Sequence, residues 1–326
     1  MNTKRIDIEL LWHLYSSGKQ TYSQLAERFL CSVKTVQRHL DKVQITHRKE
    51  FTSVAVVIMD TTYFGRGFGV MVFKNSLDGV VLYKQYVRYE TNALYLAGIS
   101  EIRRRGIDIK AIVCDGRQGL FGVFCDIPMQ MCQFHQIQII QRYLTRKPKT
   151  QAAIELKKLT LKLTKQTEIE FVNNLNYWHL RWSDYLNERS ESSITGKTYY
   201  THKRLRSAYL SLKRHLHYLF VYQRYKELMV PNTTNALEGQ FSDLKNKLRN
   251  HNGLSKARKM KFIDGFLRHK MTSEKVKKRI IRLRTIPFFD FFVSLIKLIP
   301  DRLLPSRAYF RFDLTEQNYY KILLQK

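Results

Sequence analysis

Acidic residues are scarce in this chain. Its 326 residues include 27 aspartates and glutamates against 57 lysines and arginines, which leaves a formal net charge of +30 at pH 7. A positive field of this size attracts polyanions and raises the rate at which the protein meets them. The charge therefore predicts binding to nucleic acid or to an anionic membrane surface. A ribosomal or generally adhesive basic protein is the plainer alternative.

Long apolar runs and cysteines are scarce as well. The most apolar stretch, residues 286–300, is too short to span a bilayer and contains Asp290 and Lys297, so we interpret it as a buried helix or docking segment. The N-terminus runs into Arg5 and Asp7, and no secretory signal peptide is predicted. The cysteines form no dense disulfide framework, which fits a reducing compartment; they are Cys31, Cys114, Cys125 and Cys132. Without a membrane signal, nucleic acid is the favoured partner.

Apolar residues make up 44% of the chain, which is enough for a packed core. At roughly 100–200 residues per domain, the length allows two or three domains. Composition and periodicity predict a helix-turn-helix domain at 1–48, the first part of an α/β core at 49–148, a helical insertion at 149–228, a core helix bearing a glutamate at 229–270 and a basic region at 271–326.

Residues 1–45 have the pattern of three short helices. Thr21 and Gln24 form a capping box at the start of the second helix, and Ser32 can cap the third. The polar face of the third helix carries four candidate DNA-binding residues, Lys34, Thr35, Gln37 and Arg38. Such side chains bind phosphates and read base edges in the major groove, as in a helix-turn-helix. An ordinary three-helix bundle with a solvated face is the alternative.

From residue 53 the pattern changes to strands. Strands are predicted at 54–59, 68–73, 80–87, 109–114 and 129–132, with helices at 91–105 and 134–144. A three-strand meander, a crossover helix, and then a strand, a helix and a strand are typical of a ribonuclease-H-like fold. The predicted fold class is therefore α/β, with a ribonuclease-H-like catalytic core split by an all-helical insertion and preceded by a helix-turn-helix.

The insertion loses the strand signal, and a helix is again predicted at 234–248. Trp178 and Trp182 are more consistent with the core of the insertion than with base stacking. Basic faces at 199–226, 245–261 and 275–284 are candidate contacts to the phosphate backbone, with solvated helix faces as the alternative.

Two carboxylates follow predicted strands of the core. Asp60 ends the apolar run 54–59, and Asp115 ends the strand at 109–114. Side by side at strand ends, such carboxylates repel each other unless a cation lies between them. Hard oxygen ligands in an incomplete cage suit Mg²⁺ or Mn²⁺, and two ions about 3.5–4 Å apart can hold a phosphodiester for in-line attack. The alternative is that each aspartate only caps a turn.

A third carboxylate and a cysteine–histidine pair complete the candidate site. Glu238 falls in the first turn of the helix at 234–248, where it can also serve only to complement the helix dipole. Cys132 and His135 are half of a zinc site, for which Cys125 is a possible third ligand. The other interpretations are that the pair packs beside the carboxylates, with His135 orienting a ligand or touching phosphate, or that it is simply buried.

Four segments carry a resemblance to a known family: Met59-Asp60-Thr61-Thr62-Tyr63-Phe64-Gly65-Arg66, Cys114-Asp115-Gly116, Cys132-Gln133-Phe134-His135 and Asn232-Thr233-Thr234-Asn235-Ala236-Leu237-Glu238-Gly239. Over roughly residues 50–270 the chain resembles bacterial insertion-sequence transposases of the Mutator-like superfamily. The resemblance implies a DNA transposase that cleaves and joins strands at insertion-sequence ends. It makes Asp60, Asp115 and Glu238 the catalytic metal ligands for Mg²⁺ or Mn²⁺, supported by Cys132, His135 and Asn235.

The implied partners are double-stranded DNA, both element ends and target, and further copies of the chain in a homodimer or higher oligomer on DNA, with no membrane. The expected location is the cytoplasm, at the bacterial nucleoid. Two other functions stay open: a helix-turn-helix regulator without catalysis, and a ribonuclease-H-like nuclease that cuts but does not join. Cleavage and strand-transfer products distinguish the three.

Overall fold

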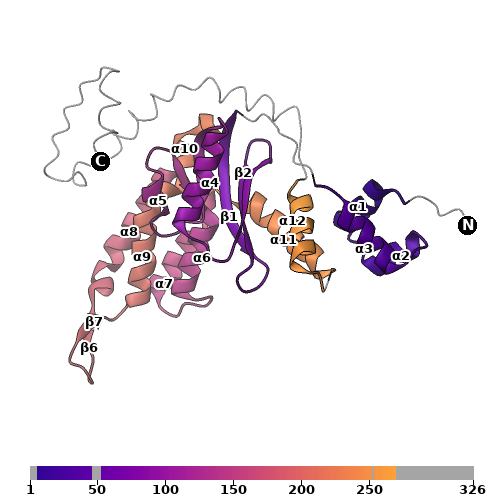
Figure 1. The fold of residues 1–326 in the computed structure, drawn as a ribbon. Coiled ribbons are helices and arrows are strands. Elements are labelled where there is room, and N and C mark those ends of the chain that lie inside the picture. Colours follow the sequence, from indigo (N-terminus) through magenta and orange to yellow (C-terminus); the bar gives the residue numbers. More distant parts are fainter. Residues whose placement is uncertain (1–5, 46–52, 252, 269–326) are drawn as a thin grey trace, which may run out of the picture. The chain divides into compact units, whose positions relative to one another are not determined.

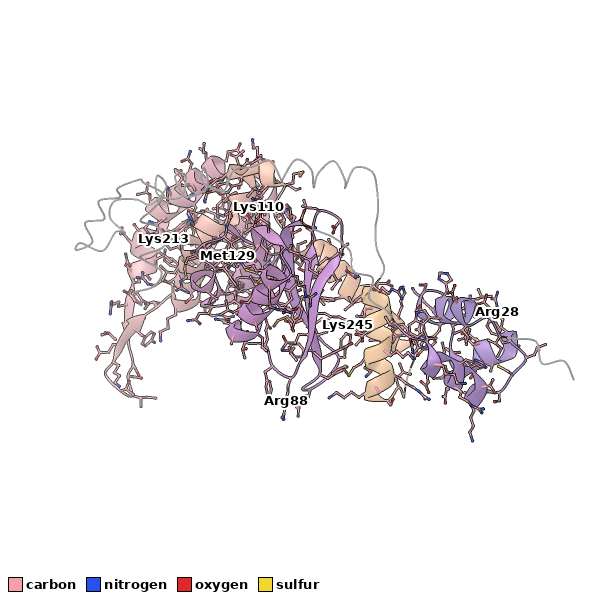
Figure 2. The ribbon with its side chains drawn as sticks, turned by 45° about the horizontal axis from the view of Figure 1, so that its top comes forward. Arg28, Arg88, Lys110, Met129, Lys213 and Lys245 are labelled. Atoms are coloured by element: carbon pink, nitrogen blue, oxygen red, sulfur yellow. The ribbon has the colours of Figure 1, made fainter. Side chains whose placement is uncertain are left out.

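The computed structural model describes residues 6–45, 53–251 and 253–268 (Figure 1). The apolar stretch at 286–300, the basic face at 275–284 and the whole region 271–326 lie outside these described residues. Within them, no helix combines the length and the apolar character needed to cross a membrane. Basic side chains are distributed along the chain, for example the exposed Arg28 and Lys213 (Figure 2).

The core is a mixed α/β structure with a five-stranded sheet in the order β3-β2-β1-β4-β5. The strands are β1 Val54–Tyr63, β2 Gly69–Asn75, β3 Val81–Val87, β4 Asp108–Cys114 and β5 Met129–Met131. β1, β2 and β3 pair antiparallel as a meander, whereas β4 pairs parallel with both β1 and β5. The predicted strand order along the chain is confirmed. The first six residues of β1 are all buried, which explains their unbroken apolar run.

Three helices accompany the sheet: α4 Asn92–Arg104, α5 Leu120–Val123 and α6 Gln133–Leu144. The helices predicted at 91–105 and 134–144 are confirmed as α4 and α6, whereas the short α5 was not predicted. Thr91 caps α4, and the helix buries Tyr95, Ile99 and Ile102 in the same core as Phe73. Gly98 is needed for this packing, because a Cβ at that position would lie 2.2 Å from Cζ of the buried Phe73 ring.

A second, largely helical core follows. Its helices are α7 Gln151–Leu161, η1 Leu163–Lys165, α8 Glu168–Asn187, α9 Lys203–Leu219, α10 Val221–Arg224 and η2 Lys226–Leu228. Trp178 and Trp182 belong to this core: their indole N–H groups donate to the Ala152 carbonyl at 3.0 Å and to Glu155 Oε2 at 2.8 Å.

The segment 149–228 is not all-helical, so that part of the prediction is wrong. The strands β6 Arg189–Glu191 and β7 Thr198–Tyr200 form an antiparallel hairpin between α8 and α9. Its cross-strand pair places Arg189 opposite Tyr200, and the guanidinium groups of Arg189 and Arg206 lie over the Tyr200 ring at 4.4 and 4.0 Å. Such cross-strand cation–aromatic contacts stabilise a short hairpin that a scan for apolar strand patterns overlooks.

Two helices after the helical segment return to the sheet: α11 Asn235–Arg249 and α12 Lys256–Leu267. Tyr86 of β3 donates to Asp264 Oδ1 at 2.6 Å, and Lys84 forms an ion pair with the same carboxylate. Lys74 of β2 donates to Gln240 of α11 at 2.9 Å. These polar contacts hold both helices against the meander.

The N-terminal residues form three helices: α1 Ile8–Ser16, α2 Tyr22–Arg28 and α3 Val33–Lys42. The capping box of Thr21 and Gln24 is confirmed, and Ser32 caps α3 through the backbone N–H of Thr35. Tyr15 of α1 packs against Phe262 of α12, with ring centroids 5.3 Å apart. The interpretation of these helices as a DNA-binding helix-turn-helix stays a prediction.

Candidate metal centre

Asp60 lies on β1, and Asp115 directly follows the neighbouring parallel strand β4. The last pair of the β1–β4 register is Ile58 opposite Val113, and each aspartate lies two residues further along the chain. β4 ends at Cys114 as predicted, but Asp60 does not end its strand. β1 continues to Tyr63 because β2 pairs with it as far as Tyr63 opposite Gly69. Asp60 therefore sits where β1 passes beyond the end of β4.

The carboxyl group of Asp60 is mostly buried and has a shifted pKa. Burial raises its pKa to about 7, and the negative charges of Asp115 and Glu238 act in the same direction. The backbone N–H of Thr61, which donates to Asp60 Oδ1 at 2.7 Å, and the charge of His135 oppose the shift. A carboxylate that interacts with two other carboxylates is stabilised in its charged form by a bound cation.

Asp115 is held by the turn that follows β4. Its Oδ1 accepts from the backbone N–H of Arg117 at 3.1 Å. The Arg117 side chain turns away from it and donates to Asn92 Oδ1 and to the Glu90 carbonyl, each at 2.8 Å. Among the described residues, no ion pair joins Asp60, Asp115 or Glu238 to a lysine or an arginine. Within the described residues, neither a lysine nor an arginine therefore neutralises the three carboxylates.

Glu238 reaches this group from the first turn of α11. Its Oε1 accepts from the Thr234 hydroxyl at 2.6 Å and lies 3.6 Å from His135 Nδ1. Thr234 occupies the N-cap position of α11, but its side chain makes no capping bond to the helix. The backbone N–H of Thr234 donates to Cys132 Sγ at 3.3 Å, and the oxygen of the Thr234 hydroxyl lies 3.3 Å from the same sulfur atom. Thr234 thus connects Glu238 to the Cys132–His135 pair.

A reciprocal contact closes the long loop between these segments. The backbone N–H of Gln133 donates to the Asn232 carbonyl at 2.9 Å, and the Asn232 side-chain amide donates to Gln133 Oε1 at 3.0 Å. Gln133 begins α6 directly after Cys132, and Asn232 precedes α11 by three residues. The two bonds therefore place the start of α11 beside the start of α6.

His135 supplies positive charge to this cluster. Burial disfavours its protonated form, but Cys132, Glu238 and Asp60 outweigh burial and raise its pKa to about 9. Burial also disfavours ionisation of Cys132, yet the hydrogen bonds from His135 and Thr234 prevail and lower the pKa of its thiol. Within the cluster, a protonated His135 therefore offsets part of the carboxylate charge.

Glu238 belongs both to the three carboxylates and to the group around Cys132. Asp60, Asp115 and Glu238 carry hard oxygen atoms of the kind that Mg²⁺ and Mn²⁺ bind. Among the described residues, the group close enough to hold a metal ion is Cys132, His135 and Glu238, whose donor atoms all lie within 4.8 Å of one another. Cys125 is exposed and is not part of that group. The described residues therefore bring together three of the four protein ligands that a structural zinc site usually has.

The other predicted site residues lie outside this cluster. Asn235 is exposed at the first position of α11. On α3, Lys34 and Arg38 are exposed, whereas Thr35 and Gln37 are half-buried. The hydroxyl of Thr35 lies 3.0 Å from that of Ser32, within the cap of the helix.

Sequence reasoning missed three residues beside the carboxylates. The Tyr95 hydroxyl donates to Glu90 Oε1 at 2.7 Å and lies 3.1 Å from Thr61 Oγ1, next to Asp60. The first two of these residues are Tyr95 and Glu90, and the third is Thr234, whose hydroxyl donates to Glu238. A tyrosine inside a helix, a glutamate before a helix cap and a threonine at an N-cap all have ordinary local roles. Only the scarcity of acids draws attention to Glu90.

The comparisons with known proteins give slight likenesses only. No protein-family model matches the chain, and no curated protein matches it. A chain of the simian T-cell lymphotropic virus intasome in complex with PP2A regulatory subunit B56 gamma matches over 64% of this chain and 74% of its own length, at 12% identity and a TM-score of 0.20. The Drosophila P element transposase strand transfer complex matches over 91% and 82%, at 13% identity and a TM-score of 0.31. TM-scores this low carry no weight for function, which rests on the residues of the site.

Proposed function

We propose that this protein is a DNA transposase of the Mutator-like kind, which cleaves DNA at insertion-sequence ends and joins the freed ends to target DNA. The observation that supports the proposal is that the charges of Asp115, which follows β4, and of Glu238 in α11 both act on the carboxyl group of Asp60 in β1. In this proposal the sheet is a ribonuclease-H-like core, the segment from α7 to η2 is its insertion, and α1 to α3 are a helix-turn-helix.

The three carboxylates would hold Mg²⁺ or Mn²⁺, and the charge interactions between Asp60 and the other two acids fit such a role. When bound, a pair of such ions activates a water or a 3′-hydroxyl and stabilises the leaving oxygen of a phosphodiester. Hydrolysis breaks one P–O bond at the element end and frees a 3′-hydroxyl. That hydroxyl then attacks a phosphodiester of the target, where one P–O bond forms and another breaks. No covalent bond to the protein is required.

The protein's own groups fix the carboxylates. The Thr234 hydroxyl donates to Oε1 of Glu238 and so orients this carboxylate. The Thr61 amide engages Oδ1 of Asp60, and the Arg117 amide engages Oδ1 of Asp115. Each acid is thus oriented through one oxygen by a neighbouring donor, as the ligands of metal sites usually are.

The test is cleavage of DNA carrying the element ends, with Mg²⁺, by Asp60→Asn, Asp115→Asn and Glu238→Gln. Each change removes a charged ligand and no DNA contact, so we expect cleavage to fall by more than about 100-fold while DNA binding is retained. Glu227→Gln is the matched control, because Glu227 lies in η2 and is not among the charges that act on Asp60. Wild-type cleavage by the Asp60 or Asp115 variant would refute the site.

The two other functions predict different products. A regulator without catalysis binds the ends and releases no cut strand at any Mg²⁺ concentration. A nuclease releases cut strands, but its products do not become joined to target DNA. Joined products that disappear together with cleavage in the three variants support the transposase over both.

A further inference from the structure

The long helix α8 has an apolar face with no partner among the described residues. One side of α8 is buried in the helical core through Phe171, Leu175 and Trp178. The opposite side carries Ile169, Tyr177 and Leu180, which are 72%, 69% and 77% exposed. Single exposed apolar residues are common, but three on the outer face of one helix indicate an interaction surface. We call the outer residues Ile169, Asn173, Asn176, Tyr177 and Leu180 the outer face of α8.

The charges of α8 do not favour a polyanion as the partner of this face. The chain as a whole carries a net charge of +30, yet α8 contains three carboxylates, Glu168, Glu170 and Asp184, against one arginine, Arg181. Glu168 forms an ion pair with Arg224, and Arg181 lies 3.5 Å from Glu155, so α8 presents no excess of positive charge. Two copies of so basic a protein repel each other elsewhere. Electrostatic repulsion between two copies is therefore weakest at a surface, such as that of α8, whose local charge is not positive.

The outer face is also complementary to itself. Ile169, Asn173, Asn176 and Leu180 are spaced by four, three and four residues, the spacing of a coiled-coil seam. If two α8 helices pair antiparallel about a two-fold axis between Asn174 and Leu175, Ile169 of one copy faces Leu180 of the other. The same axis brings Asn173 opposite Asn176. Apolar layers then flank a central polar layer that fixes the register.

We propose that the outer face of α8 binds the same face of a second copy of this chain, antiparallel, to form a two-fold dimer. One helix pair is smaller than a standard interface of roughly 800 Å² per partner, so the dimer is expected to dissociate in the micromolar range. The contact involves neither the carboxylate cluster nor DNA. It can therefore be tested whether or not the proposed function holds.

The first experiment is sedimentation of the full chain without DNA or added metal, at a salt concentration that screens the net charge. The wild type is expected to dimerise, and Leu180→Glu to weaken the dimer by at least about tenfold, because the new charge faces Ile169 of the other copy. Leu96→Glu is the matched control on α4, where Leu96 is 45% exposed, and it should not change the dimer. A monomeric wild type, or a Leu180→Glu variant that dimerises normally, overturns the proposal.

The second experiment tests the antiparallel register. Cys125 is exposed, so the background is Cys125→Ser. In that background the pair Ile169→Cys with Leu180→Cys should give covalent dimers with a short thiol-specific cross-linker. Ile169→Cys alone should not, because the two copies of position 169 lie about 16 Å apart at 1.5 Å per residue. Equal cross-linking by both variants overturns the antiparallel arrangement.

Discussion

The hydroxyl of Thr234 donates to Oε1 of Glu238 at 2.6 Å, from the N-cap position of the helix that carries the glutamate. The same hydroxyl lies 3.3 Å from Cys132 Sγ and 3.5 Å from His135 Nδ1. Thr234 is therefore a positioning residue for Glu238. Of the three carboxylates, Glu238 is the one whose place depends most on contacts between distant segments. The Thr234 side chain is buried, so the hydroxyl donates to a protein group and not to bulk water.

The first prediction concerns this hydroxyl. Thr234→Val keeps the branched shape but removes the donor, so Glu238 loses the bond that orients it. We expect cleavage to fall by about 10–100-fold and the Mg²⁺ concentration for half-maximal rate to rise. Thr234→Ser restores the hydroxyl and should stay close to wild type. If Thr234→Val needs no more Mg²⁺ than the wild type, the residue has only a packing role.

The second prediction concerns the kind of metal. Hard oxygen ligands bind Mg²⁺ and Mn²⁺ weakly, whereas a structural zinc site resists gentle removal. EDTA should abolish cleavage reversibly, with activity restored by Mg²⁺ and the circular dichroism spectrum unchanged. A zinc-selective chelator should have no effect. One tightly bound zinc per chain that is lost in Cys132→Ser would instead assign Cys132, His135 and Glu238 to a zinc site.

The third prediction concerns α3 and follows from the proposed helix-turn-helix. Lys34→Ala and Arg38→Ala should each weaken binding to all duplexes and reduce the salt slope of binding by about one. Gln37→Ala should mainly lower the preference for element ends over random DNA. Arg28→Ala is the control, since Arg28 is equally exposed but lies on α2. Losses of the same size in Arg28→Ala would mean that charge alone, and not α3, accounts for the effect.

The fourth prediction concerns packing between α4 and the sheet. In Gly98→Ala the new Cβ meets Cζ of the fully buried Phe73, and the overpacking should destabilise the fold by about 1–3 kcal/mol. Gly239→Ala is the matched control in α11, because a Cβ there meets nothing within 4 Å. That variant should gain up to about 1 kcal/mol from helix propensity. Denaturant unfolding of both variants measures the difference.

The fifth prediction concerns acid stability through His251, which packs between Tyr15 and Phe262 with ring centroids 4.4 and 5.2 Å away. Burial lowers its pKa, so the unfolded chain takes up the proton first. Its contribution is complete above the unfolded pKa of about 6.5 and is lost as pH falls from there through the folded pKa. His251→Gln should flatten the fall in stability below pH 6.5. An unchanged slope would assign the fall to other histidines whose pKa values burial also lowers, His179, His215 and His217.

The sequence by itself determined the elements whose signals are local. The unbroken apolar run of β1, the crossover helix α4 with its Thr91 cap and the capping box at Thr21 depend on neighbours within a few residues. Asp60 and Asp115 were placed near one edge of the sheet for the same reason, since each directly follows an apolar run. The missed hairpin of β6 and β7 is held by cation–aromatic contacts, which leave no apolar periodicity to detect.

Only the tertiary structure decided how Glu238 meets the aspartates. Glu238 lies 123 positions after Asp115, and sequence spacing sets no distance across a loop of that length. The two hydrogen bonds between Gln133 and Asn232 close the loop and carry the start of α11 to the start of α6. The extension of β1 past Asp60 was likewise decided by its pairing with β2, because a strand continues as long as a neighbour accepts its backbone hydrogen bonds.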